Sequence, residues 1–287
     1  MRQVLFEVPY VGVKIFGYGL MLFFAFLGSM NLAARRARRE GLDPELIYDL
    51  ALWVFIGGLL GARGFYVAQY WGTRITSFAE IFEIWKGGIV LYGSVLGGAA
   101  AFFAYRAVRP FPLRPMLDVI APAIALGIAI GRVGCFLNGC CWGDACDLPW
   151  AVSFPRESPP WNAELARGLI PPDALHSLRL HPTQLYSTID GLILVLLLSA
   201  YYPLRRRDGE VMGLLMLTYP VTRFFIEQLR DDEGVFFAGM TVSQAISVAL
   251  FAGGLIYWAF LLRMPATRYA DTAEPIMTPG TSPIATT

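Results

Sequence analysis

The sequence predicts an all-α membrane protein with about seven transmembrane helices, and three observations support this fold class. The chain has 287 residues, of which 56% are hydrophobic, whereas soluble domains are about 45–50% apolar. Its mean hydropathy is +0.52. The apolar residues gather in blocks of roughly 20 residues, the length that a helix needs to cross a bilayer. Several blocks are rich in glycine, which is typical of membrane helices that pack closely.

Seven blocks are long enough to span, and they cover residues 15–34, 47–71, 88–108, 116–136, 183–203, 211–229 and 241–263. The longest link, 144–182, is rich in proline and polar groups, and we expect it to form a small cap on one face. We expect residues 1–263 to form one transmembrane domain. Residues 264–287 are rich in threonine and proline and predict a disordered tail.

Arginine clusters follow alternate blocks and predict the orientation. They are Arg35, Arg36, Arg38 and Arg39; Arg106, Arg109 and Arg114; Arg205, Arg206 and Arg207; and Arg263 with Arg268. Because basic loops stay in the cytoplasm, the N-terminus is expected outside, the C-terminus inside, and the cap on the outer face. The first residues lack the pattern of a removable signal peptide, so the first block should remain a membrane helix. A net charge of +1 without a basic stripe does not suggest nucleic-acid binding.

Ionisable residues inside apolar blocks predict a site. Arg63, Arg132, Arg223 and Glu227 lie within or at the edges of such blocks, where one arginine costs about 2.5–3.5 kcal/mol. Taken singly, each residue is explained by snorkelling of its side chain to the interface. For Arg223 and Glu227, a structural ion pair at i,i+4 is a further explanation. Together with Arg230, however, Arg132 and Arg223 come near the outer ends of their helices. Convergent guanidinium groups match a phosphate, which predicts a site for an anionic lipid headgroup from the outer leaflet.

Six motifs occur in an order that resembles one family. They are YGLM at 18–21, GARGFY at 61–66, the glycines between Gly87 and Gly98, GRVGCFLNGCCWG at 131–143, HPTQLY at 181–186 and RFFIEQLR at 223–230. Over nearly all of residues 15–262, the chain resembles the prolipoprotein diacylglyceryl transferases of bacterial inner membranes.

The resemblance implies a reaction. The diacylglyceryl group of phosphatidylglycerol moves to the lipobox cysteine thiol in the signal peptide of a prolipoprotein, and glycerol-1-phosphate leaves; no metal or bound cofactor is implied. Arg132 and Arg223 would stabilise charge on the departing phosphate, with Glu227 and Tyr92 completing the catalytic set. The implied substrate-binding residues are Tyr18, Arg63, Gly93, Gly131, Asn138, Gly143, His181, Tyr219 and Arg230. Gly93 and Gly131 are expected to permit close backbone approach.

The chain departs from the family at the expected base. Tyr92 stands where the family commonly has histidine, and a tyrosine with an unperturbed pKa of about 10 is a poor base near neutrality. Glu227, Tyr92 and His181 remain candidate proton acceptors, or the substrate thiol ionises beside the arginines without a dedicated base. A divergent paralogue with an altered acceptor is therefore an alternative.

All four cysteines lie within twelve residues. Cys135 and Cys140 stand at the Asn and Glu of the family signature, and Cys141 and Cys146 complete the pattern C-x4-C-C-x4-C. At an outer face we expect at least one disulfide that braces the loop, with three possible connectivities. Free thiols packed as small hydrophobes are an alternative. Zinc binding is a weaker one, because the spacing is not that of a finger.

Two other functional classes compete with a transferase. A lipid transporter or flippase would also carry buried charges, but it predicts internal repeats, and the sequence has no clear one. A membrane thiol oxidoreductase is suggested by adjacent Cys140 and Cys141, but its usual C-x-x-C pair is absent. The sequence does not predict an oligomeric state.

Overall fold

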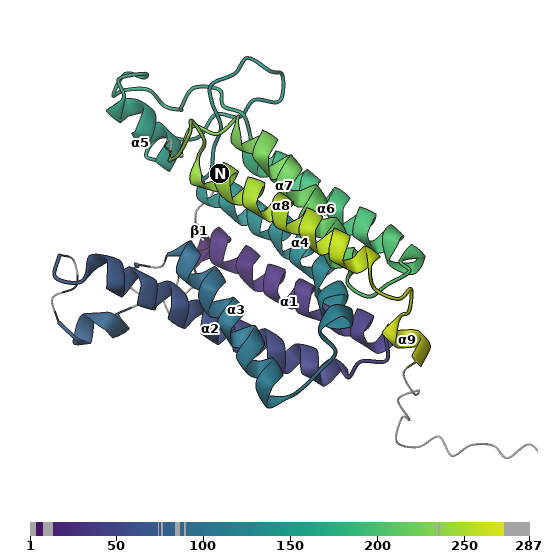
Figure 1. Cartoon of the computed structure of the whole chain (residues 1–287). Helices are drawn as coiled ribbons and strands as arrows, with labels where there is room; N and C mark the ends of the chain where they lie inside the picture. Colours follow the sequence, from purple (N-terminus) through teal and green to yellow (C-terminus); the bar gives the residue numbers. More distant parts are fainter. Residues whose placement is uncertain are drawn as a thin grey trace, which may run out of the picture. The chain divides into compact units, whose positions relative to one another are not determined.

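The computed structural model describes residues 4–7, 14–73, 75, 77–83, 87–88, 90–232, 234 and 236–272, and most of these residues are helical (Figure 1). The long helices are α1 (Gly17–Arg39), α2 (Pro44–Tyr70), α3 (Leu91–Val108), α4 (Leu113–Asn138), α6 (Thr183–Tyr201), α7 (Glu210–Glu227) and α8 (Val242–Leu262). Short helices are α5 (Pro159–Ala166) and α9 (Tyr269–Thr272), and 3-10 turns are η1 (Ala79–Phe82) and η3 (Tyr202–Leu204). Strands β1 (Val4–Glu7) and β2 (Lys14–Phe16) form an antiparallel hairpin that the sequence analysis did not predict.

Each of the seven predicted blocks corresponds to one long helix. Within the described residues, five segments are long and apolar enough to cross a membrane, namely Gly17–Arg39, Pro44–Tyr70, Leu113–Asn138, Thr183–Leu204 and Val242–Leu262. The other two helices are α3, with 18 residues, and α7, which contains Glu210, Arg223 and Glu227. The prediction of an all-helical, multi-pass membrane protein is confirmed at this level.

Residue choice at the helix ends explains several boundaries. Asp43 accepts a hydrogen bond from the Glu45 backbone N–H at 2.9 Å, and Pro44 follows at the first helical position of α2. Thr241 and Gln244 form a reciprocal capping box at the start of α8. These caps satisfy backbone N–H groups that the first turn of a helix leaves unpaired.

The chain divides into two compact units. One consists of Met1–Ala33 and Leu117–Thr272, and the other contains Ala34–Met116. The single domain expected over residues 1–263 stays a prediction. Helix α9 lies within the expected disordered tail, and the Tyr269 backbone N–H donates to Asp208 at 2.7 Å. Residues 273–287 of that tail lie outside the described residues.

In the unit that contains α2 and α3, glycines form the contact between these two helices. A Cβ added to Gly61 would overlap the carbonyl oxygen of Gly93, and one added to Gly97 would overlap that of Gly57. The two G-x-x-x-G patterns therefore bring the helix backbones into direct contact, as in other membrane helix pairs. The close approach expected of Gly93 is confirmed.

We predict that Gly97→Ala destabilises the protein, because the new methyl group meets backbone that cannot rotate away. Gly64→Ala, on the partner helix α2, is the matched control, since no described atom lies within 4 Å of its added Cβ. That control should be neutral or stabilising by up to about 1 kcal/mol, because alanine is the better helix former. Thermal unfolding in detergent measures the effect, and equal midpoints for the two variants would contradict the packing argument.

The other unit is built mainly from α4, α6, α7 and α8. Its core cluster consists of Ala121, Ala125, Leu194, Leu198, Tyr202, Val211 and Leu215. Gly191 lets α6 approach α4, because an added Cβ would lie 2.9 Å from the Ala129 Cβ. These contacts place α4, α6 and α7 side by side (Figure 1).

A buried carboxylate closes one end of this helix group. Asp118 on α4 is fully buried and accepts the backbone N–H groups of Gly209, Val211 and Met212 at 2.7–3.0 Å. Arg205 lies 3.4 Å from the same carboxylate and is 4% exposed. Asp118 thus caps the start of α7 from another helix. The sequence analysis missed this role and counted Arg205 only as a basic loop residue.

The predicted cap is a folded segment. It contains α5 and pairs Val152 with Leu180 through an isolated β-bridge. Phe154 is fully buried, and the carboxylate of Glu164 accepts the Leu178 backbone N–H at 2.9 Å. Burial raises the pKa of Glu164. The outer-face position of this cap stays a prediction.

Candidate functional site

The end of α4 builds the first part of the candidate site. Gly139 adopts a φ of 75°, and the Cys140 N–H donates to the Cys135 carbonyl at 3.1 Å while the Gly139 N–H donates to Phe136 at 3.3 Å. These two bonds define a Schellman motif, in which the residue after the glycine contacts the helix residue five positions earlier. The C-x4-C spacing across Asn138-Gly139 therefore brings Cys140 against Cys135.

The loop after α4 is tied to two other helices. Thr183 and Gln184, at the start of α6, donate to the carbonyls of Cys141 and Cys140 at 2.7 and 2.8 Å. Gly143 donates to the His181 carbonyl at 3.1 Å, and a Cβ at Gly143 would lie 2.5 Å from the Leu229 carbonyl oxygen. Only glycine fits where these backbone segments meet, and the role expected of Gly143 in substrate binding stays a prediction.

Arg132 and Arg223 line one narrow pocket, which brings the predicted arginine pair together; in this structure the pocket has no room for a water molecule. Its other lining residues come from α4, α6 and α7 and are Ile128, Ser187, Asp190, Tyr219 and Ile226. Arg223 is 9% exposed and lies 2.6 Å from Glu227 and 3.1 Å from the Ser243 hydroxyl. Its Nη1 is buried without a hydrogen-bond partner among the described residues. A buried, unpaired guanidinium N–H is costly unless a ligand accepts from it.

Glu227 lies between two arginines. Its carboxylate is 2% exposed and contacts Arg223 at 2.6 Å and Arg230 at 3.1 Å, and Thr241 donates to it at 3.3 Å. Arg230 also makes a two-pronged contact with Asp232 at 2.8 and 2.9 Å. The guanidinium of Arg230 therefore contacts two carboxylates of its own chain. The guanidinium of Arg223 contacts one carboxylate, and its Nη1 has no partner among the described residues.

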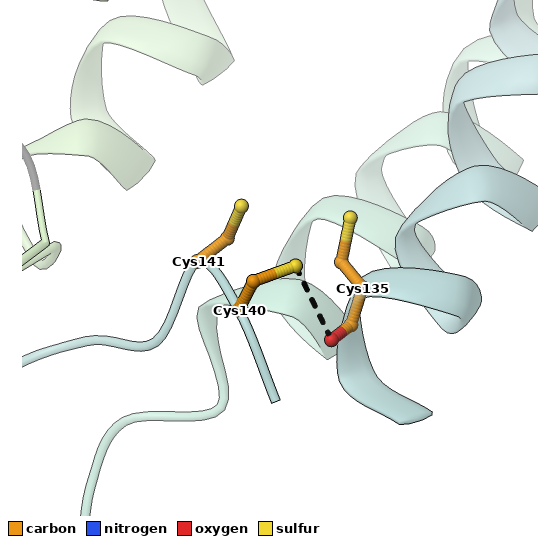
Figure 2. A group of neighbouring side chains, drawn as sticks. All are labelled: Cys135, Cys140 and Cys141. Carbon is orange, nitrogen blue, oxygen red and sulfur yellow. Dashed lines mark hydrogen bonds between the residues drawn. The ribbon is translucent and has the colours of Figure 1, made fainter. Parts of the chain in front are cut away.

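Three of the four cysteines form a cluster (Figure 2), and Arg132 and Arg230 lie near it. The sulfur atoms of Cys135, Cys140 and Cys141 all lie within 4.8 Å of one another, and the Cys140 thiol donates to the Cys135 carbonyl at 3.7 Å. Hydrogen bonding from the Cys135 and Cys140 thiols, helped by the charges of Arg230 and Arg132, lowers the pKa of Cys141. All four cysteines are free thiols, and Cys146 lies outside the cluster. The expected disulfide stays a prediction.

Tyr18 and Asn138 lie near this cluster, as the sequence predicts for site residues. Tyr18 on α1 is close enough to interact electrostatically with the three cysteines and Arg132, and Asn138 is hydrogen-bonded to Cys140. Gly131 corrects an expectation, because no described atom lies within 4 Å of an added Cβ. Close backbone packing therefore does not account for Gly131, which instead leaves space next to Arg132.

Arg63, Tyr92 and Gly93 belong to the other unit. The Arg63 guanidinium donates to the carbonyls of Ile81 and Gly87 at 2.8 Å, to Gly88 at 3.1 Å, and to Glu80. Arg63 is 8% exposed and thus braces the segment before α3. Tyr92, in the first turn of α3, is 41% exposed.

His181 lies half-buried at the entry to α6. Its Nδ1 lies 3.2 Å from the Tyr186 hydroxyl, which accepts a hydrogen bond from the Trp150 indole at 2.8 Å. The backbone of His181 pairs with Gly143 and Asp144. His181 therefore connects the cap to the loop that carries the cysteines.

Several site residues were missed by the sequence analysis. Asp190 lines the arginine pocket and accepts from Thr222 at 3.0 Å. It is an acidic residue within an apolar block, which is the same signal that identified Arg132. Gln184 is fully buried and lies inside HPTQLY. Ser243 and Asp232 have no comparable signal, because their roles depend on helix contacts.

The fold and site together define a multi-pass helical membrane protein in which two neighbouring arginines, one of them buried with an unpaired nitrogen among the described residues, offer donors to an anionic group. The prolipoprotein diacylglyceryl transferase family matches residues 3–260, nearly the whole chain. The chain therefore belongs to this family.

Three relatives named phosphatidylglycerol–prolipoprotein diacylglyceryl transferase illustrate the match. The protein of Synechococcus elongatus is 36% identical over 254 residues, which cover 86% of this chain and 84% of the relative. That of Clostridium tetani is 33% identical, covering 86% of this chain and 93% of the relative. That of a Nostoc species is 30% identical, covering 94% of each.

Proposed function

We propose that this chain transfers the diacylglyceryl group of phosphatidylglycerol to the lipobox cysteine of prolipoproteins, the first step of lipoprotein maturation. The observation that carries the proposal is that Arg132, Arg223 and Tyr219 meet at one narrow pocket, where one nitrogen of Arg223 is buried without a hydrogen-bond partner among the described residues. A phosphate oxygen is the acceptor that such a nitrogen fits best. Family membership supports the same activity.

In the proposed reaction, the acceptor thiolate forms a bond to the terminal glyceryl carbon of the lipid. The bond between that carbon and the phosphate oxygen breaks, and its electron pair leaves with glycerol-1-phosphate. Arg132 and Arg223 stabilise this charge electrostatically. Glu227 holds Arg223 at 2.6 Å, and Arg230 holds Glu227 in turn at 3.1 Å. We assign Glu227 and Arg230 to positioning Arg223.

The thiol proton needs an acceptor. The carboxylate of Glu227 already contacts Arg223, Arg230 and Thr241, which leaves it poorly placed as a base. His181 is engaged with Tyr186. We therefore favour ionisation of the acceptor thiol beside the arginines, with Tyr92 as the remaining side-chain candidate.

The proposed setting is the bacterial inner membrane. Seven spans, with the N-terminus outside and the C-terminus in the cytoplasm, agree with the alternating arginine clusters. In this topology the arginine pocket faces the outer, periplasmic leaflet, and residues 144–182 cap it there. Phosphatidylglycerol of that leaflet and the signal peptide of a secreted prolipoprotein are then both within reach.

Complementation tests the proposal. Bacteria depleted of their own diacylglyceryl transferase would express this chain, and a reporter prolipoprotein would be scored for its lipid-dependent gel shift. We expect a shift, with a reporter whose lipobox cysteine is serine as the negative control. A well-inserted protein that gives no shift would contradict the proposal and favour a paralogue with another acceptor, or a lipid transporter.

A further inference from the structure

The clustered cysteines are not required by the transfer reaction described above. Their sulfur atoms lie within 4.8 Å of one another. A zinc ion bound tetrahedrally at about 2.3 Å from each sulfur separates its ligand sulfurs by about 3.8 Å. The three thiols are therefore close to the spacing of a metal site before any ion binds.

The backbone fixes this arrangement. The Schellman motif at Gly139 sets Cys140 against Cys135, and Cys141 follows with a φ of 61°. A non-glycine residue in this left-handed region costs about 1–3 kcal/mol and persists only where its surroundings hold it there. Here Gln184 and Thr183 hold the carbonyls of Cys140 and Cys141. Strain that is kept at one residue by buried partners is typical of a functional site.

The cluster is accessible and has one position open. The three cysteines are half-buried rather than enclosed, so an ion and one further ligand can enter. Within the described residues, no fourth cysteine, histidine or carboxylate joins the cluster. Three protein ligands with an open fourth position are the pattern of catalytic, not structural, zinc.

We propose that Cys135, Cys140 and Cys141 bind one Zn²⁺ ion, in place of the disulfide expected from the sequence, and that its fourth position accepts the thiol of an acceptor peptide. The second part rests on the proposed transferase function. A thiol that coordinates a metal loses its proton, which leaves into solvent with the water displaced from the ion, so the site supplies an acceptor thiolate where Tyr92 replaces the family histidine. From the sequence, zinc binding is only a weaker alternative, because C-x4-C-C is not a finger spacing and the three thiols meet through the fold of the loop.

Metal content tests the site directly. The full chain is purified in detergent under reducing conditions without chelator, and zinc is measured by mass spectrometry. We expect one zinc per chain. Cys135→Ser, Cys140→Ser and Cys141→Ser should each weaken binding by more than about tenfold, since even changes behind the ligands cost 10–100-fold. Cys146→Ser is the matched control and should keep the metal.

Cobalt exchanged for zinc reports the fourth ligand. Tetrahedral Co²⁺ with three thiolates absorbs through sulfur-to-metal charge transfer, and a lipobox peptide should increase that absorption while its Cys→Ser counterpart does not. Metal-free wild-type protein, a disulfide within the trio found by non-reducing mass mapping, or equal loss of metal in Cys146→Ser would overturn the site. An equal change in absorption with both peptides would overturn the proposal that the acceptor thiol takes the fourth position on the metal. Zinc-loaded protein that fails complementation would contradict the proposed function and leave the metal site standing.

Discussion

Arg223→Ala and Arg132→Ala are each expected to abolish detectable lipid transfer. Removal of one preorganised donor to a developing oxyanion lowers kcat by about 100- to 1,000-fold. For Arg223 the structure gives a direct reason, because its Nη1 is buried in the pocket wall while its other contacts hold it against Glu227 and Ser243. The alanine variants should insert into the membrane in the same amount as the wild type. They should leave the reporter prolipoprotein without its lipid-dependent gel shift.

Lysine at either position should not restore full activity. Lysine is a point charge on a flexible stem and cannot grip a phosphate through two parallel N–H groups. Arg39→Ala, at the exposed end of α1, is the matched control and should transfer normally. The measurement is the rate of reporter modification in isolated membranes, normalised to the amount of inserted enzyme. Wild-type rates in Arg223→Ala would refute the role assigned to that residue.

Asp118→Ala is expected to cause the largest loss of stability. The change leaves the backbone N–H groups of Gly209, Val211 and Met212, and the buried guanidinium of Arg205, without their carboxylate. Breaking a buried pair in this way costs about 3–5 kcal/mol. For a unit of this size, such a loss lowers the thermal midpoint by roughly 10 °C.

Asp118→Asn separates the two parts of this network. The amide oxygen can still accept the N–H groups of Val211 and Met212, but it carries no charge for Arg205. Its midpoint in detergent should therefore lie between those of the wild type and Asp118→Ala. Protein that remains folded should retain transfer activity, because Asp118 does not line the arginine pocket. An unchanged midpoint in Asp118→Ala would contradict the capping role.

The sequence by itself determined the positions of the long helices and the arginine pair. The block predicted at 183–203 begins at the same residue as α6, and that at 241–263 differs from α8 by one residue at each end. Apolar blocks of bilayer length are a local property that any one segment carries on its own. Arg132 and Arg223 were identifiable because a guanidinium in an apolar helix needs a partner or a ligand.

Only the tertiary structure decided how the polar groups pair. Arg63 and Arg230 carry the same sequence signal as Arg223, yet Arg63 binds backbone carbonyls and Arg230 binds Asp232 and Glu227. The cysteine loop is held by Gln184, 44 residues away from Cys140, and the start of α7 by Asp118, 91 residues before Gly209. The physical reason is that a buried polar atom takes whichever partner the packed helices bring within about 3 Å, and sequence patterns within one segment do not contain that distance.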